Sequence, residues 1–134
     1  MNLGIAVARP GDELVTALVK NASALDFVSF VRTLQTQIRK ARAGEDQADA
    51  SVQLLLTYMG GFQMVDAIPV LVSPAAAILF AGEAFPVDGV PHVNLVLTFD
   101  HRLINGVGGA EFLNAVAANL ENAEALVERG MAGA

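Results

Sequence analysis

The chain has 134 residues, a net charge of −6 at pH 7 and no cysteine. This length suits one domain with its own core, and the lack of cysteine excludes a disulfide framework, a thiol nucleophile and a thiolate metal site. The acidic balance, with only eight Lys and Arg residues scattered along the chain, argues against a nucleic-acid partner.

The composition is more apolar than that of ordinary soluble domains. Hydrophobic residues make up 54% of the chain and charged residues 16%, against about 45–50% and about 25% in such domains. We therefore expect apolar surface to be buried between subunits of a homo-oligomer. The longest uncharged run, Ala67 to Gly82, is shorter than the roughly 20 residues that a membrane-spanning helix needs. With no secretory signal at its start, the chain is expected to be cytoplasmic, without a membrane partner.

The first predicted elements are two strands, Leu3 to Ala8 and Leu14 to Val19. Between them, Pro10 presets one turn dihedral and Gly11 accepts a positive φ, so the strands form an antiparallel hairpin.

A helix is predicted next, with Ser23 as its N-cap and its end at about Arg42. Apolar residues recur every three or four positions and form one stripe, made by Phe27, Phe30 or Val31, Leu34 and Ile38. Basic residues in the last turns complement the helix dipole, namely Arg39, Lys40 and Arg42.

The middle of the chain predicts an exposed connector followed by strands. The connector, Gly44 to Ser51, is polar, and the strands that follow it are Val52 to Thr57, Ile68 to Val72 and Ala75 to Ala81. The last of these is uncharged and is expected to be fully buried. A tight turn at Val87-Asp88-Gly89 then leads, as a second hairpin, into a strand from His92 to Phe99.

The chain closes with a helix that begins near Val107 and is interrupted at Asn122. A further helical segment, Ala123 to Arg129, follows, and the tail from Gly130 to Ala134 is expected to fray. The order of elements predicts one α+β domain over residues 1 to 134, with helices on one face of a mixed sheet.

The most chemically specific stretch is Asp100-His101-Arg102-Leu103-Ile104-Asn105-Gly106, between the last strand and the last helix. A histidine at a strand end can be held by one ring nitrogen while the other faces a cleft, which suits a general base. The other histidine, His92, has no second histidine or carboxylate at ligand spacing. It is therefore predicted to be a surface residue, and no metal site is expected.

This stretch resembles the signature Asp-His-Arg-x-x-Asp-Gly of the catalytic domain of 2-oxoacid dehydrogenase dihydrolipoyl acyltransferases, which share the chloramphenicol acetyltransferase fold. Asn105 stands where the signature has aspartate. The segment Asn2 to Ala8 is similar to the family's strand Asn-Ile-Gly-Ile-Ala-Val, and Ser73 to Gly82 is similar to its Pro-Pro-Gln-Ala-Ala-Ile-Leu-Ala-Val-Gly. The resemblance extends to about Leu126 and lacks the opening helix and strands of the family's domain, so an N-terminally shortened chloramphenicol acetyltransferase-like fold is expected.

The resemblance implies a site made of three residues. His101 would take the proton from the thiol of coenzyme A or dihydrolipoamide, and Thr57 would donate to the oxyanion, because it stands where the family has a serine or threonine hydroxyl. Such sites lie between the subunits of a trimer, so a homotrimer is expected. Asn105 is the third candidate. In the wider fold an aspartate there pairs with an arginine from the N-terminal part, whereas an asparagine has no charge that needs a partner.

Two classes of function remain open. The first is an acyltransferase-like enzyme that needs no metal and acts on a thioester of coenzyme A or of a carrier; the cations Arg39, Lys40 and Arg42 would then either bind coenzyme A phosphates or simply end a solvated helix. The second is a non-catalytic oligomerisation or partner-binding module. A variant of the second is one half of a split enzyme, completed by a separately encoded N-terminal half along an exposed sheet edge.

Overall fold

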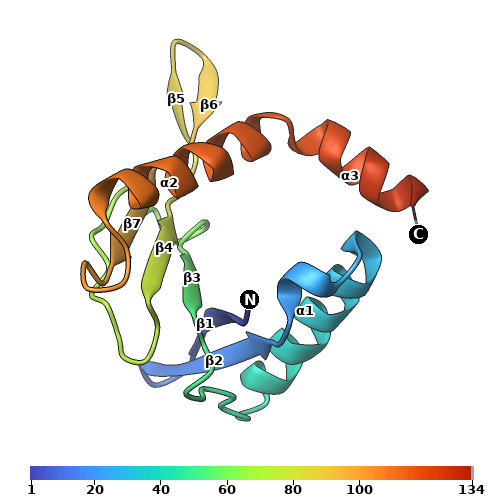
Figure 1. Ribbon diagram of the computed structural model, residues 1–134, viewed down its shortest axis with the longest axis vertical. Helices are drawn as coiled ribbons and strands as arrows, with labels where there is room; N and C mark the ends of the chain where they lie inside the picture. The colour runs from blue at the N-terminus through green and yellow to red at the C-terminus, as the bar shows by residue number, and fades with distance from the viewer. Residues whose placement is uncertain (134) are drawn as a thin grey trace.

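The computed structural model describes residues 1–133 and has a mixed five-stranded sheet, in the order β2-β1-β3-β4-β7, with helices against one face (Figure 1). The strands are β1 (Leu3–Arg9), β2 (Glu13–Val19), β3 (Leu54–Tyr58), β4 (Ala77–Ala81) and β7 (Leu95–Phe99). The β1/β2 and β4/β7 pairs are antiparallel, and the β1/β3 and β3/β4 pairs are parallel. The predicted α+β class is confirmed.

The helices cover one face of this sheet in two places (Figure 1). They are η1 (Ala22–Ala24), α1 (Phe27–Arg42), α2 (Gly106–Glu121) and α3 (Ala123–Ala132). Helix α1 packs on β1 and β2, α2 packs on β7, and α3 touches both of the other long helices. Asn122 separates α2 from α3, as predicted. None of the helices in residues 1–133 is long and apolar enough to cross a membrane.

The register explains why one face is apolar throughout. A single row of paired residues crosses the sheet and is made by Ala17, Ile5, Leu56, Leu79 and Leu97. Since side chains alternate along a strand, the row lies on one face, and every second residue of each strand joins it. Under α1 the core contains the β1 and β2 members of this face, and under α2 it contains those of β3, β4 and β7.

The interior strand β4 is the most buried of the strands, as its sequence predicts. Ile78 and Phe80 point to the face opposite the helices and are only 2% exposed. The chain from 59 to 76 covers part of that face, because the Thr98 hydroxyl donates to the Pro69 carbonyl oxygen at 2.8 Å and Ala75 packs with Leu18.

The predicted strand from Ile68 to Val72 is wrong, because this segment pairs with no other strand. Pro69 has no N–H to donate to a ladder, and its carbonyl oxygen is taken by a side chain instead. Ile68 and Val70 point outward and are 85% and 81% exposed. The segment is therefore a loop with exposed apolar side chains.

The second hairpin is confirmed, with a small ribbon at its tip. Strands β5 (Phe85–Val87) and β6 (Val90–His92) pair around Asp88 and Gly89, which both have positive φ, as a type I′ turn requires. The predicted strand from His92 to Phe99 begins too early, because residues up to His92 belong to the ribbon and β7 begins at Leu95. His92 is exposed, as predicted.

The predicted N-cap Ser23 is wrong. Ser23 lies in η1, where its hydroxyl accepts from the Met1 amino group at 2.9 Å. Asp26 caps α1 instead, since its carboxylate accepts from the Ser29 backbone N–H and hydroxyl, both at 2.8 Å. These bonds lower the pKa of Asp26 below its usual value.

Asp26→Ala is expected to lower the midpoint of urea unfolding, because α1 loses the acceptor for its first free N–H groups. Ser23→Ala, three residues earlier, should leave the midpoint nearly unchanged and is the matched control. The Asp26 contribution should also fade as pH falls below the ordinary aspartate pKa, because the folded state holds this carboxylate ionised. Equal midpoints for the two variants would show that Asp26 does not cap α1.

The predicted fraying from Gly130 onwards is wrong for Gly130 to Ala132, because these residues are helical. Helix α3 continues past Arg129 to Ala132, and Gly130 lies against Phe27 of α1 so closely that a Cβ there would be 2.7 Å from the Phe27 Cβ. This contact between helices far apart in sequence holds the final turn. Ala134, the end of the predicted tail, lies outside the described residues.

The predicted connector, Gly44 to Ser51, is largely exposed but is held against the sheet. The Asp46 carboxylate accepts from the Thr16 N–H at 2.9 Å, and the Gln47 side-chain oxygen accepts from the Leu18 N–H at 3.0 Å. These bonds occupy the outer edge of β2, which would otherwise present unpaired N–H groups.

Candidate active site

His101 lies two residues after the end of β7, in the turn that leads to α2. The Asp100 N–H donates to the Ala76 carbonyl oxygen at 2.9 Å, so this turn lies beside the start of β4. The His101 side chain is exposed, and its ring lies on that of Phe99, with centroids 4.7 Å apart and planes tilted by 47°. An accessible imidazole at a strand end is suited to accept a proton from a bound thiol.

Asn105 is the N-cap of α2. Its backbone is extended (φ −82°, ψ 166°), and its side-chain oxygen accepts from the Gly108 N–H at 2.8 Å. Asparagine and aspartate cap helices about equally well, so either residue type can end this turn. Asn105 thereby fixes the position of α2 relative to the turn that carries His101.

The two residues beside His101 pair with each other across it. The Arg102 guanidinium donates to the Asp100 carboxylate at 2.6–3.1 Å, and the Arg102 N–H adds a bond at 2.9 Å. These bonds lower the pKa of Asp100 to about 2. The pair closes the turn that carries His101.

Arg102→Ala is expected to raise the pKa of Asp100 from about 2 towards its ordinary value of 3.8. The stability that this pair contributes is fully present above pH 3.8 and is lost as pH falls towards 2, because the folded state has the lower pKa. Titration of the Asp100 carboxyl carbon by NMR measures the change. An unchanged titration in the variant would show that Arg102 does not hold this carboxylate.

Thr57 lies on β3, half-buried, far from His101 in the same chain. It pairs with Phe80, which pairs with Val96, so two strand spacings and the length of β7 from Val96 to Phe99 separate Thr57 from His101. The two strand spacings together span about 10 Å across the sheet, and the length of β7 adds about 10 Å along it. Thr57 also faces away from the helices, since Leu56 faces them. One chain therefore does not bring the two predicted site residues together.

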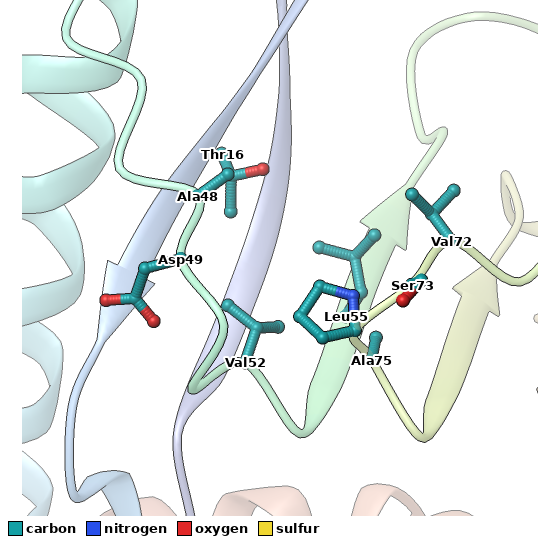
Figure 2. Close-up of a pocket in the computed structure, with 9 residues that line it drawn as sticks. Thr16, Ala48, Asp49, Val52, Leu55, Val72, Ser73 and Ala75 are labelled. Carbon is teal, nitrogen blue, oxygen red and sulfur yellow. The ribbon is translucent and has the colours of Figure 1, made fainter.

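Two cavities lie away from His101. A pocket of about 60 Å³ opens between the connector and the loop before β4 (Figure 2). It is lined by Thr16, Ala48, Asp49, Val52, Leu55, Val72, Ser73, Pro74 and Ala75. A larger hollow of about 480 Å³ lies between α1 and the connector and includes Lys20 and Lys40. Both of these cations are near acids, since Lys20 is 3.4 Å from Asp49 and Lys40 is 4.0 Å from Glu45.

No group of three or more His, Asp or Glu side chains in residues 1–133 could hold a metal ion. Two contacts of the site escaped the sequence analysis, namely the Phe99 ring under His101 and the close approach of Gly109 to Phe99. The only signal for the second was a glycine inside a helix, where alanine is normally preferred.

The chain is similar to known acyltransferases over nearly its whole length. Residues 1–128 match the family described as 2-oxoacid dehydrogenases acyltransferase (catalytic domain). The chain is 29% identical over 138 residues to the dihydrolipoyllysine-residue acetyltransferase component of the acetoin cleaving system of Bacillus subtilis, covering 95% of this chain and 34% of that protein. It is 31% identical over 135 residues to a multifunctional 2-oxoglutarate metabolism enzyme of Mycolicibacterium vanbaalenii, covering 86% of this chain and 11% of that protein.

Solved structures show the same fold. A probable dihydrolipoamide acetyltransferase from Listeria monocytogenes superposes with a TM-score of 0.73 at 31% identity, covering 91% of this chain and 56% of that one. Dihydrolipoamide acetyltransferase from Azotobacter vinelandii superposes with a TM-score of 0.77 at 26% identity, covering 95% and 56%. The chain thus spans about a third or less of these curated relatives and just over half of these solved chains.

The Azotobacter vinelandii protein bears on the motif directly. Its crystallographic and enzymatic study concerns the role of a serine, a histidine and an asparagine in its catalytic mechanism, with the asparagine four residues after the histidine. His101 and Asn105 have the same spacing here. An asparagine at this position is therefore found in a protein of that fold whose chain extends well beyond the part matched here.

Proposed function

This chain belongs to the family of 2-oxoacid dehydrogenase acyltransferase catalytic domains. We propose that it transfers an acyl group between a thioester and a thiol, with His101 as general base. The observation that carries the proposal is the exposed imidazole of His101 at the end of β7, inside the matched residues. The thiols proposed are those of coenzyme A and dihydrolipoamide.

The proposed reaction needs one base and one oxyanion donor. His101 accepts the proton of the attacking thiol, and the thiolate sulfur forms a bond to the thioester carbonyl carbon. The tetrahedral oxyanion then collapses, the original carbon–sulfur bond breaks, and the departing thiolate takes the proton back from the imidazolium. A positioned general base contributes about 10²–10⁴-fold to such a reaction.

The proposed oxyanion donor is the Thr57 hydroxyl of a second copy of the chain, in a homotrimer. Two observations support this arrangement. Thr57 and His101 are far apart within one chain, as the sheet register shows. Large apolar side chains are also exposed where no helix covers them, namely Leu14, Ile68, Val70 and Val72.

Asn105 is proposed to act on catalysis through the turn that it caps. Its bond to the Gly108 N–H sets where α2 begins, and α2 begins next to the His101 ring, since a Cβ on Gly106 would be 4.0 Å from the His101 Cε1. The catalytic asparagine at the same spacing in the Azotobacter vinelandii relative supports this assignment.

Calorimetric titration with coenzyme A and acetyl-coenzyme A, together with light scattering, tests the proposal. We expect binding by a trimer, and His101-dependent acyl transfer to dihydrolipoamide. A stable oligomer that neither binds coenzyme A nor transfers an acyl group would overturn it. That result would favour a non-catalytic oligomerisation module.

A second proposal, for a partner strand, follows from the different hydrogen bonding at the two edges of the sheet. At the outer edge of β2, the Thr16 and Leu18 N–H groups donate to the side chains of Asp46 and Gln47. In the described part of the chain, β7 pairs only with β4 and its outer edge receives no such bonds. We propose that a strand of a separately encoded N-terminal half adds to β7, as β-augmentation would allow. Co-purification from the native host should recover this partner, and its repeated absence would contradict the proposal.

A further inference from the structure

The His101 ring has an aromatic neighbour, Phe99. Among residues 1–133 the His101 imidazole has no ring hydrogen bond, whereas the Nδ1 of the other histidine, His92, lies 2.9 Å from the Val90 carbonyl oxygen. The His101 ring does contact the ring of Phe99, 4.7 Å away between centroids. We infer that Phe99, seated against Gly109, is the positioning residue for the catalytic base, an inference that rests on the proposed function of His101.

Phe99 can orient another ring because it is itself fixed. It is part of the core under α2, together with residues of β3, β4 and β7. Its ring also lies against Gly109, which is buried in the first turns of α2. A Cβ on Gly109 would be 2.6 Å from the Phe99 Cε1 and 2.8 Å from its Cζ. Any side chain at Gly109 must therefore displace the Phe99 ring.

The adjacent glycine provides a matched comparison. A Cβ on Gly108 would meet only ordinary contacts, the nearest being the Asn105 Oδ1 at 3.6 Å. Both residues lie in the first turns of the same helix, where alanine is normally the better helix former. Gly108→Ala should therefore stabilise the protein or leave it unchanged, while Gly109→Ala should move Phe99 and, with it, His101.

The displacement is expected to reach the chemistry because a general base must lie within hydrogen-bond reach of its proton. A misplacement of about 1 Å can cost about 10²-fold in rate. We expect Gly109→Ala to lower kcat for acyl transfer about ten- to a hundredfold with little change in KM, because the substitution moves the base. Gly108→Ala should leave both constants close to those of the parent protein.

Proton NMR of the histidine Cε1–H groups provides a readout besides activity. The chain has only two histidines, and His92→Gln assigns their signals. The His101 signal should carry a ring-current shift from Phe99. This shift should change in Gly109→Ala and disappear in Phe99→Leu, but it should persist in Gly108→Ala.

The possible outcomes separate this inference from the proposed function. If the His101 signal and kcat are the same in Gly109→Ala as in Gly108→Ala, the inference is overturned. If the signal moves but the parent protein transfers no acyl group, the contact is supported and the proposed function fails. Should Gly109→Ala not fold, the double variant Phe99→Leu/Gly109→Ala removes the clash, and we expect it to fold with the His101 signal still displaced.

Discussion

His101→Gln is expected to lower kcat for acyl transfer by about 10²–10⁴-fold, because the attacking thiol loses its general base. The side chain is exposed and lies outside the buried core, so the unfolding midpoint and the oligomer mass should not change. A coupled assay of coenzyme A release measures kcat, urea unfolding measures the midpoint, and light scattering on the same samples measures the oligomer mass.

His92→Gln is the control for this substitution. His92 is also exposed, but it lies in the β5/β6 ribbon rather than next to α2. We expect it to retain the parent rate. Equal rates in the two glutamine variants would contradict the role of His101, whether both were slow or both were fast.

Thr57→Val is expected to lower kcat by about 10²–10³-fold, since it removes one oxyanion donor while keeping the shape of the side chain. Valine is a good strand former, so β3 should persist and the unfolding midpoint should change little. Thr57→Ser keeps the hydroxyl and should retain most of the activity. If serine and valine at this position gave the same rate, the hydroxyl would have no part in the reaction.

Much of the fold could be predicted from the sequence where local patterns are strong. The turn residues Pro10 and Gly11 identified the first hairpin, and Asp88 and Gly89 identified the turn of the second. The apolar stripe predicted α1, and Asn122 marked the break between the last two helices. In each case the controlling interactions lie within a few residues of one another in the chain.

Other features depend on contacts that no local pattern specifies. Ile68 to Val72 has the composition of a strand, but it pairs with no other strand, and the Thr98 hydroxyl donates to its Pro69 carbonyl oxygen. The cap of α1 is Asp26 rather than Ser23, because the Met1 amino group engages Ser23 before the helix begins.

In the candidate site, too, some features follow from the local sequence and others depend on distant contacts. The motif around His101 indicated the family and the candidate base, and the cap formed by Asn105 follows from its position before a helix. The distance between Thr57 and His101 could not be predicted, because it depends on the register of β3, β4 and β7. That register is what points to a site made by two copies of the chain.

The central claim, that each site combines His101 of one copy with Thr57 of another, is tested most directly by mixing inactive variants. His101→Gln and Thr57→Val chains, co-expressed in equal amounts with different tags, should assemble together. Each trimer that contains both variants has one intact site in three and should recover about one third of the parent activity, so the whole population should recover about one quarter. Activity no higher than that of either variant alone, in oligomers shown to contain both tags, would contradict a shared site.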